Sequence, residues 1–345
     1  MKKIIAIVGA RPQFIKHFSF EKACEGRIDL ITIHTGQHFD ENMSEIFFDQ
    51  LGMQRPKYIL KNGGGNHGTQ TGKMMIDIEA IVENERPEGV VVYGDTNSTL
   101  AGALVAAKLH IPIYHIEAGL RSFNKDMPEE INRVLTDHIS EKLFITSQVA
   151  SENLQREGID SGLVLVGDIM KDVVQYVVEN GFLESKKVNF DYYYVTIHRP
   201  YNTDSIERLI YIFEELNKLS KKVIIALHPR TKKLAKQYQV EFQKYSNLIV
   251  IEPQSYFDNL SYLKYSNGLV TDSGGMQKEA YWLQKKCVTI RKETEWVETI
   301  ELEGNHLLFD DLNQLEELLN RQPKYWDTNL YGDGNAGKRI VQQII

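Results

Sequence analysis

The sequence predicts an α/β protein made of two Rossmann-like domains that face each other across a cleft. Its 345 residues are about twice the length of a typical domain. Short runs rich in β-branched residues alternate with amphipathic helical stretches, which is typical of a parallel sheet with helices on both faces. The pattern restarts after about residue 168, so we expect one such sheet in each half of the chain.

The first half contains short apolar runs that predict strands. They cover residues 4–8, 30–34, 89–93, 113–116 and 142–146. Helical patterns lie between them, and the clearest are 101–109 and 128–140. Strands that are separated by helices pair in parallel, so their carboxyl ends lie along one edge of the sheet.

The second half repeats this arrangement. Its predicted strands cover 192–197, 223–227, 248–251, 268–270 and 288–290, with a helix at 276–284. We therefore predict an N-terminal domain over 1–168, a C-terminal domain over 169–334, and a terminal helix over 335–345 that packs back on the first domain. Ligands of open parallel sheets bind beyond the carboxyl ends of the strands, so the residues just after each strand are the site candidates.

Composition and missing motifs exclude several classes of function. The net charge of −7, without a long run of one sign, predicts no nucleic-acid partner. No apolar run is long enough to cross a bilayer, so we expect no membrane partner. Cys24 and Cys287 have neither a metal-ligand spacing nor a disulfide framework, which predicts reduced thiols, a cytoplasmic protein and no metal site. Walker and GxGxxG motifs are both missing, so we expect no cofactor.

One strand-to-helix turn has the features of an anion site. Ser273, Gly274 and Gly275 follow a predicted strand and open a predicted helix. The glycines allow backbone N–H groups to approach an anion, and the helix dipole favours negative charge there. Ser273 can add a hydroxyl donor, and Glu279 can accept hydrogen bonds from ribose hydroxyls. A glycine turn with an N-cap serine and a solvated glutamate explains the same residues equally well.

Cationic side chains also follow predicted strands. Arg11 and Lys16 come after the first strand, where a guanidinium fork and an ammonium group can bind phosphate. His198 and Arg199 follow the first strand of the second half, and His228 follows the next. A lone histidine is more often structural, but two of them at strand ends, each near an arginine, favour a functional role. Solvated turns are the alternative for Arg11 and Lys16.

Three carboxylates lie at the corresponding positions of the first half. Asp95 follows one strand, Glu117 follows the next, and Glu130 lies in the first turn of a helix. Acids that converge on one cleft suit general acid/base chemistry. Asp95 could equally cap a helix, and Glu130 could simply favour a helix N-terminus. Glu117 is preceded by apolar residues, and we expect it to be half-buried.

Together these segments resemble one family, the non-hydrolysing UDP-N-acetylglucosamine 2-epimerases of bacteria and archaea. The resemblance runs almost from end to end, and it depends on the order of several short motifs. They are Gly-x-Arg-Pro at 9–12, Thr-Gly-Gln-His at 35–38, Gly-Asp-Thr at 94–96, Glu-Ala-Gly-Leu-Arg at 117–121, Pro-Glu-Glu-x-Asn-Arg at 128–133, His-Arg at 198–199, His-Pro at 228–229 and Asp-Ser-Gly-Gly-x-Gln at 272–277. No single motif is decisive, but the ordered set is specific.

The resemblance implies a fold similar to the GT-B glycosyltransferases and a reaction at carbon 2 of a UDP-sugar. UDP is eliminated across carbons 1 and 2, which gives a bound 2-acetamidoglucal, and then adds back with protonation from the opposite face. No nicotinamide or metal is implied. A homodimer is implied, and we expect the product to feed surface polysaccharide synthesis.

The resemblance also implies roles for individual residues. The expected catalytic residues are Asp95, Glu117, Glu130 and His198, and the expected UDP-sugar-binding residues are Arg11, Lys16, Arg199, His228, Gln254, Ser273, Gly274, Gly275 and Glu279. We expect Asp95 or Glu117 to handle the carbon-2 proton. His198 and Arg11 are expected to stabilise the departing diphosphate.

Two departures from the common family pattern concern the sugar. The first turn reads Gly-Ala-Arg-Pro-Gln where many members have Gly-Thr-Arg-Pro-Glu, and Trp296 stands where several carry arginine. Both resemble the subgroup that acts on UDP-2,3-diacetamido-2,3-dideoxyglucuronate, so this sugar stays open as a substrate. A GT-B glycosyltransferase, a hydrolysing 2-epimerase and a non-catalytic UDP-sugar sensor also stay open. A sensor would not need the three acids.

Overall fold

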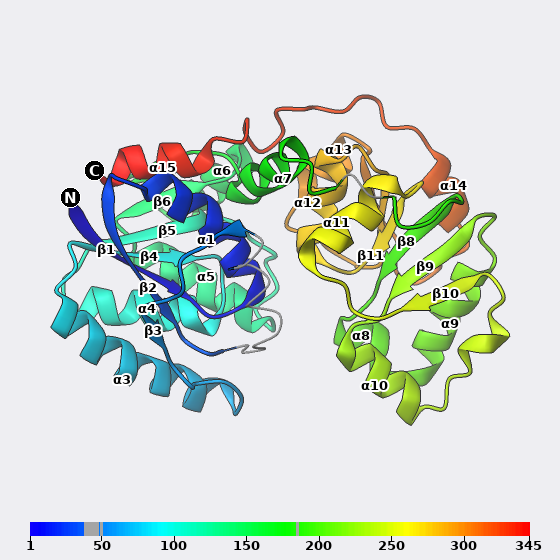
Figure 1. Cartoon of the computed structure of the whole chain (residues 1–345), viewed down its shortest axis with the longest axis horizontal. Coiled ribbons are helices and arrows are strands. Elements are labelled where there is room, and N and C mark those ends of the chain that lie inside the picture. Colours follow the sequence, from blue (N-terminus) through cyan, green and yellow to red (C-terminus); the bar gives the residue numbers. More distant parts are fainter. Residues whose placement is uncertain (38–47, 49–50, 184–185) are drawn as a thin grey trace. The chain divides into compact units, whose positions relative to one another are not determined.

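The computed structural model describes residues 1–37, 48, 51–183 and 186–345. These residues form two compact units, the first comprising Met1–Gln175 and Asn329–Ile345 and the second Tyr176–Thr328. Residues 169–175 and 329–334, which the sequence analysis placed in the second domain, group with the first unit. Figure 1 shows the helices and strands of both units.

The first unit is built on a seven-stranded sheet with the order β3-β2-β1-β4-β5-β6-β7, in which all pairs are parallel. Its elements are β1 (Lys2–Val8), α1 (Arg11–Cys24), β2 (Ile28–His34), β3 (Tyr58–Ile59), α3 (His67–Glu85), β4 (Gly89–Tyr93), α4 (Asn97–Lys108), β5 (Ile113–Ala118), α5 (Pro128–Ile139), β6 (Lys142–Ile145), α6 (Gln148–Arg156), β7 (Leu163–Leu165), the first part of α7 (Ile169–Glu179) and α15 (Ala336–Ile344).

Both faces of this sheet are buried, which explains why its strands read as continuous apolar runs. Side chains alternate between the two faces of a strand. In β1, Ile4 and Ala6 pack in the cluster that includes α1 and α15, whereas Ile5 and Ile7 pack in the cluster that includes α3 and α4. The last helix of the chain thus packs in the core of the first unit, beside α1 (Figure 1).

One buried acid near α15 should make stability depend on pH. Asp172 accepts hydrogen bonds from the backbone N–H groups of Ala336 (3.0 Å) and Gly337 (2.8 Å), and so caps the start of α15. Burial raises the pKa of Asp172 to about 6, and repulsion from Asp168 and Asp333 adds to the rise. The folded state therefore binds this proton more tightly than the unfolded state, in which an aspartate has a pKa of about 3.9.

We expect the free energy of unfolding to rise as the pH falls from about 6 to about 4, because the folded state then binds the Asp172 proton. As the pH rises back through this window, the free energy of unfolding should fall by roughly 1–3 kcal/mol. The measurement is urea unfolding of the wild type and the Asp172→Asn variant at about pH 4.5 and about pH 7, because the variant lacks the titrating group. The wild type should gain stability relative to the variant at the lower pH. An equal difference at both pH values would contradict this assignment.

The second unit is built on a six-stranded parallel sheet with the order β10-β9-β8-β11-β12-β13. Its elements are β8 (Tyr192–Thr196), α8 (Pro200–Thr203), α9 (Ile206–Asn217), β9 (Lys222–Ala226), α10 (Pro229–Gln237), the 3₁₀ turn η1 (Phe242–Lys244), β10 (Leu248–Ile251), α11 (Tyr256–Tyr265), β11 (Leu269–Thr271), α12 (Gly274–Trp282), β12 (Cys287–Thr289), α13 (Val297–Glu301), β13 (Asn305–Leu307) and α14 (Leu315–Asn320).

The predicted α/β class with two parallel sheets is confirmed. Each strand that the sequence predicts is present within a few residues of its predicted bounds. The unpredicted strands β3, β7 and β13 have two or three residues each, which is too short for a pattern to show. No helix among the described residues is long and apolar enough to cross a membrane.

Candidate active site

In the first unit, a buried ion pair lies at the carboxyl end of the sheet. Glu117 is the second-last residue of β5, and Lys16 lies on α1. The Lys16 ammonium donates to Glu117 Oε2. Both side chains are buried, so their mutual attraction offsets the cost of removing each charge from water. From the sequence Lys16 was expected to bind phosphate, whereas in the structure it contacts this carboxylate.

Glu117 also has an unusual backbone conformation. Its φ is +69°, and the register between β5 and β6 shifts between Ile116 and Ala118. A left-handed residue other than glycine, asparagine or aspartate costs of order 1 kcal/mol or more, and such residues cluster at functional sites. The bulge re-aims one side chain at the end of the strand. The observed strain therefore supports a functional role for this carboxylate.

The turn after β4 lies directly beside the ion pair. Gly94 has a φ of +59°, which glycine adopts without strain. A Cβ atom at position 94 would lie 3.3 Å from Glu117 Oε2 and 3.4 Å from Lys16 Nζ, so the bare glycine lets the turn approach both. Asp95 follows immediately. Thr96, not Asp95, caps α4, since Thr96 Oγ1 accepts from the Thr99 N–H at 3.3 Å.

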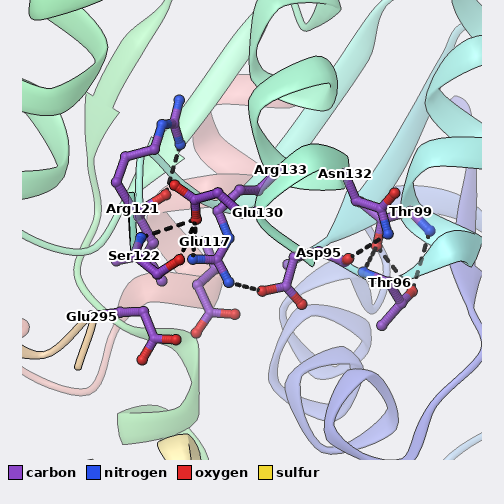
Figure 2. Close-up of polar contacts among 12 residues, drawn as sticks. Asp95, Thr96, Thr99, Glu117, Arg121, Ser122, Glu130, Asn132, Arg133 and Glu295 are labelled. Atoms are coloured by element: carbon purple, nitrogen blue, oxygen red, sulfur yellow. Dashed lines mark hydrogen bonds and ion pairs between the residues drawn. The ribbon is translucent and has the colours of Figure 1, made fainter. Parts of the chain in front are cut away.

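Arg133 joins the other two candidate acids. Figure 2 shows its guanidinium reaching from Glu130 to Asp95. Nη1 lies 3.1 Å from Glu130 Oε2, and Nη2 donates to Asp95 Oδ2. Asp95 is the more exposed of the two acids, with 31% of its side chain accessible against 4% for Glu130. The structure thus brings all three predicted acids to one edge of the first sheet.

The Glu130 carboxylate is hydrogen-bonded to the loop before α5. It accepts hydrogen bonds from Ser122 N–H, Ser122 Oγ and Phe123 N–H, each at 2.9 Å. Phe123 itself has a φ of +58°, so these bonds hold a strained loop. With Arg133 added, the carboxylate receives four donors, and in this arrangement it positions the loop and Arg133.

Gln13 fixes the start of α1 to the turn after β4, and it explains one departure from the family pattern. Its Oε1 accepts from the Gly9 N–H (2.8 Å) and the Ala10 N–H (3.1 Å), while its Nε2 donates to the Tyr93 carbonyl (2.8 Å). The oxygen and the nitrogen of the Gln13 amide thus both form hydrogen bonds. A glutamate at this position would have no N–H group to donate to the Tyr93 carbonyl. Arg11, at the first position of α1, belongs to the segment that Gln13 holds.

In the second unit, Asp272 organises the loop that carries His198. Asp272 is fully buried, and its carboxylate accepts from the backbone N–H groups of His198 (3.0 Å) and Arg199 (2.9 Å) and from Asn202 Nδ2 (3.1 Å). His198 Nδ1 lies 3.0 Å from Asp272 Oδ1, so this nitrogen carries the ring proton. Burial alone would raise the pKa of Asp272, but His198 and the other donors hold it below its usual value.

The start of α12 is the predicted anion site. Ser273 caps the helix, and the helix begins at Gly274, two residues before the predicted start. The N–H groups of Gly274 and Gly275 therefore belong to the first turn, where no intrahelical acceptor exists. A Cβ atom on Gly275 would meet nothing within 4 Å in the described structure, so packing does not require glycine there.

The surroundings of this helix start are polar. A Cβ atom at Gly274 would lie 3.7 Å from Arg291 Nη1 and 3.8 Å from Trp296 Nε1. The unusual Trp296 therefore lies beside the predicted anion site, with its N–H side nearest. Glu279, on the same helix, is buried, which contradicts the alternative of a solvated glutamate.

The remaining candidates lie at the carboxyl ends of β9 and β10 or beside His198. His228 caps α10, with Nδ1 accepting from the Arg230 N–H at 3.3 Å, and its ring lies 5.6 Å from that of His198. Arg199 Nε is buried without a hydrogen-bond partner among the described residues. Gln254 donates to the Glu252 carbonyl at 2.6 Å. His38, the last residue of the Thr-Gly-Gln-His motif, lies outside the described residues.

Several residues that hold these side chains in place were not predicted from the sequence. Sequence motifs include Arg133, Gln13 and Asp272, but no individual role was predicted for them. His115, Asp137 and Arg121 form a buried hydrogen-bonded chain beneath the turn after β4. The signal that could have found Asp272 is its position after an apolar strand, where a charged residue requires partners.

The chain is similar to known proteins over nearly its whole length. The family model for UDP-N-acetylglucosamine 2-epimerase matches residues 22–345. A Pseudomonas aeruginosa UDP-2,3-diacetamido-2,3-dideoxy-D-glucuronate 2-epimerase is 44% identical, over 99% of both chains. A Methanocaldococcus jannaschii UDP-GlcNAc 2-epimerase, solved in complex with UDP-GlcNAc and UDP, is 42% identical over 99% of both chains, with a TM-score of 0.90. A Polygonum tinctorium UDP-glucosyltransferase shares the fold alone, at 11% identity, a TM-score of 0.61 and coverage of 99% of this chain and 92% of that chain.

Proposed function

The chain belongs to the UDP-N-acetylglucosamine 2-epimerase family, and from this premise we propose that it inverts carbon 2 of a UDP-N-acetylhexosamine without net hydrolysis. The observation that carries the proposal is the buried Glu117–Lys16 pair beside the Asp95 turn. A strained, buried carboxylate next to a more accessible one supports proton transfer on both faces of a single carbon.

In the proposed reaction, one carboxylate of the first unit removes the proton from carbon 2. The electron pair of that C–H bond forms the carbon 1–carbon 2 double bond, and the bond from carbon 1 to the diphosphate oxygen breaks, which releases UDP. In the return step UDP adds to carbon 1, and carbon 2 receives a proton on the opposite face. Glu117 and Asp95 are the proposed proton carriers, and we assign Glu130 and Arg133 to positioning.

The nucleotide is the proposed ligand of the second unit. The first-turn N–H groups of α12 are suited to the diphosphate, and the dipole of the helix adds to the attraction. Glu279 is the proposed acceptor for ribose hydroxyls. His198, whose Nδ1 proton is directed to Asp272, is the proposed partner of the departing diphosphate, together with Arg11. Neutralising the leaving group matters because the proton on carbon 2 is weakly acidic.

UDP-N-acetylglucosamine is the first proposed substrate, and UDP-2,3-diacetamido-2,3-dideoxyglucuronate is the second. The second is favoured by Trp296 beside the start of α12 and by the Pseudomonas aeruginosa relative, which is named for that sugar. A cytoplasmic homodimer that supplies surface polysaccharide synthesis is also part of the proposal. The two cysteines are free and buried, which fits a reducing compartment.

Incubation with UDP-N-acetylglucosamine in D2O tests the proposed reaction. We expect deuterium at carbon 2 of intact UDP-sugar and a mixture of both carbon-2 epimers, followed by NMR. Solvent deuterium enters because the abstracted proton exchanges before re-addition on the other face. A parallel incubation with the diacetamido uronate identifies the preferred sugar by its faster exchange.

The other outcomes separate the competing functions. Steady accumulation of free UDP and free sugar would replace the proposal with hydrolysis. Intact, unlabelled sugar from both substrates, with UDP bound, would favour a glycosyltransferase or a sensor. A glycosyltransferase is then distinguished by transfer once an acceptor is supplied, whereas a sensor stays inactive.

A further inference from the structure

His115 lies within β5, two residues before Glu117, and is fully buried. Its two ring nitrogens each lie 2.7 Å from an oxygen: Nδ1 from Asp137 Oδ1, and Nε2 from the Gly94 carbonyl. A carbonyl and an ionised carboxylate only accept hydrogen bonds. Both nitrogens must therefore carry a hydrogen, and the geometry points to a buried imidazolium.

The charges around His115 support this state. Asp137 Oδ2 accepts from Arg121 Nη1 at 2.7 Å and from the Gly119 N–H at 3.1 Å. Burial alone would raise the pKa of Asp137, but its contacts with His115 and Arg121 lower it. The Arg121 guanidinium at 2.7 Å favours an ionised carboxylate whatever the state of the His115 ring. Arg121 is balanced in turn by Glu157, at 2.7 and 2.6 Å.

The hydrogen-bonded series that runs from His115 to Glu157 contains two positive and two negative charges, which cancel. At the outer end, His138 Nε2 lies 3.5 Å from Glu157 Oε2. Asp137 on α5 is the charged group that faces the His115 ring directly. A positive ring is therefore compensated in the buried site, as a buried charge requires.

The Gly94 carbonyl that His115 holds belongs to the turn beside Glu117. The Gly94 N–H donates to the Ile116 carbonyl at 2.9 Å, so the residue is held through both of its backbone polar groups. A Cβ atom added at position 94 would lie 3.3 Å from Glu117 Oε2 and 3.4 Å from Lys16 Nζ, so the turn lies close to both groups. Asp95 is the next residue. A shift of this peptide would move Asp95 and open the space around Glu117.

We propose that the second proton on the His115 ring fixes the Gly94 peptide and thereby sets the placement of Asp95 relative to Glu117. His115 is then a positioning residue, and this role rests on the proposed function. Misplacement of reacting groups by about 1 Å can reduce a rate by about 10²-fold. Loss of the bond to Gly94 should therefore lower kcat much more than it changes KM.

Two variants separate this role from a general structural one. The amide nitrogen of asparagine can replace Nδ1 and keep the donor toward Asp137, whereas that of glutamine can replace Nε2 and keep the donor toward Gly94. We expect His115→Asn to lose about 30- to 100-fold in kcat, with KM within about threefold, and His115→Gln to lose less than about tenfold. Equal losses in both variants would overturn the proposal.

His17→Gln is the matched control, because His17 is also buried in the first unit. Its Nδ1 lies 2.8 Å from Tyr93 Oη, and its Nε2 lies 2.9 Å from Thr32 Oγ1 and 3.4 Å from Glu21 Oε2. The Tyr93 hydroxyl can donate to Nδ1, so a ring with a hydrogen on Nε2 alone satisfies these contacts. We expect its kcat to stay within about threefold of wild type. If kcat falls as far as in His115→Asn, loss of any buried histidine has that effect and the proposal fails.

A spectroscopic measurement tests the protonation state without any activity. In protein with ¹⁵N-labelled histidine, the His115 signals are those missing from the His115→Gln spectrum. Both ring nitrogens should show the protonated chemical shift at neutral pH. A deprotonated shift on either nitrogen overturns the proposal. If His115→Gln does not fold, the spectrum of the His115→Asn variant supplies the same assignment. If wild type exchanges no sugar proton but both nitrogens are protonated, the proposed function has failed and the buried imidazolium stands.

Discussion

Replacement of Glu117 by glutamine is expected to abolish carbon-2 exchange and to leave UDP binding intact. Glutamine keeps the size and one acceptor of the side chain but cannot take up a proton at neutral pH. General acid–base groups typically contribute about 10²- to 10⁴-fold, so we expect deuterium exchange at carbon 2 to fall by about 10³-fold. UDP affinity, measured by calorimetry, should change by less than about threefold, because the substitution leaves all of the proposed UDP-binding groups in place, both those of the second unit and Arg11.

The buried partner of Glu117 complicates a single substitution. In Glu117→Gln the Lys16 ammonium loses its counter-charge in a buried position, which can unfold the site by a route unrelated to proton transfer. The double variant Lys16→Met, Glu117→Gln removes both charges and replaces the stem of the lysine with a similar apolar one. We expect it to recover most of the lost thermal stability and none of the exchange. Exchange above about a tenth of the wild-type rate in either variant would remove Glu117 from the proton transfer.

The fold could be predicted because it depends on patterns that are local in the sequence. Continuous apolar runs mark strands that are buried on both faces, and a helical period marks the elements between them. The candidate residues were found for the same reason, since the ends of parallel strands hold the site. Asp95, Glu117 and His198 are all close to such ends.

The contacts of these residues could not be predicted, because they join segments far apart in the chain. Lys16 and Glu117 are separated by 101 positions, and His198 and Asp272 by 74. The amino-acid sequence does not indicate the positive φ of Glu117, because glutamate rarely adopts a positive φ. The acidic first turn of α5 favours a helix start whatever the side chain contacts, so the sequence could not reveal that Glu130 holds the loop before it.

The second large effect is expected at Asp272. Its two oxygens accept from the His198 and Arg199 N–H groups, from Asn202 and from the His198 ring. Asparagine at this position has one accepting oxygen, and its NH₂ group would face N–H donors. Leaving buried donors without acceptors costs about 1–3 kcal/mol each, so Asp272→Asn should lose roughly 2–4 kcal/mol of unfolding free energy.

Thermal unfolding measures this loss. Each kcal/mol shifts Tm by about 2–4 °C in domains of this size, so a fall of roughly 4–16 °C is expected. The contribution of the carboxylate should be present above about pH 4 and disappear as the pH falls further, because the pKa of Asp272 is lowered in the folded state. An unchanged Tm would show that the loop does not depend on this residue.

The effect on the reaction should be larger than the effect on stability alone explains. Without Asp272 the His198 ring loses the acceptor that keeps its proton on Nδ1, so a fraction of molecules has the wrong tautomer or ring orientation. We expect carbon-2 exchange to fall by about 10²- to 10³-fold at a temperature where the variant is folded.

Asn202→Ala is the matched control, because it removes one donor to Asp272 and leaves His198 untouched. Its side chain also donates to the Ile290 carbonyl at 3.0 Å, so the variant should lose a comparable amount of stability. Its exchange rate should stay within about fivefold of wild type. If both variants lose activity in proportion to stability, Asp272 acts only as a structural acceptor, and the orientation of His198 is set by other contacts.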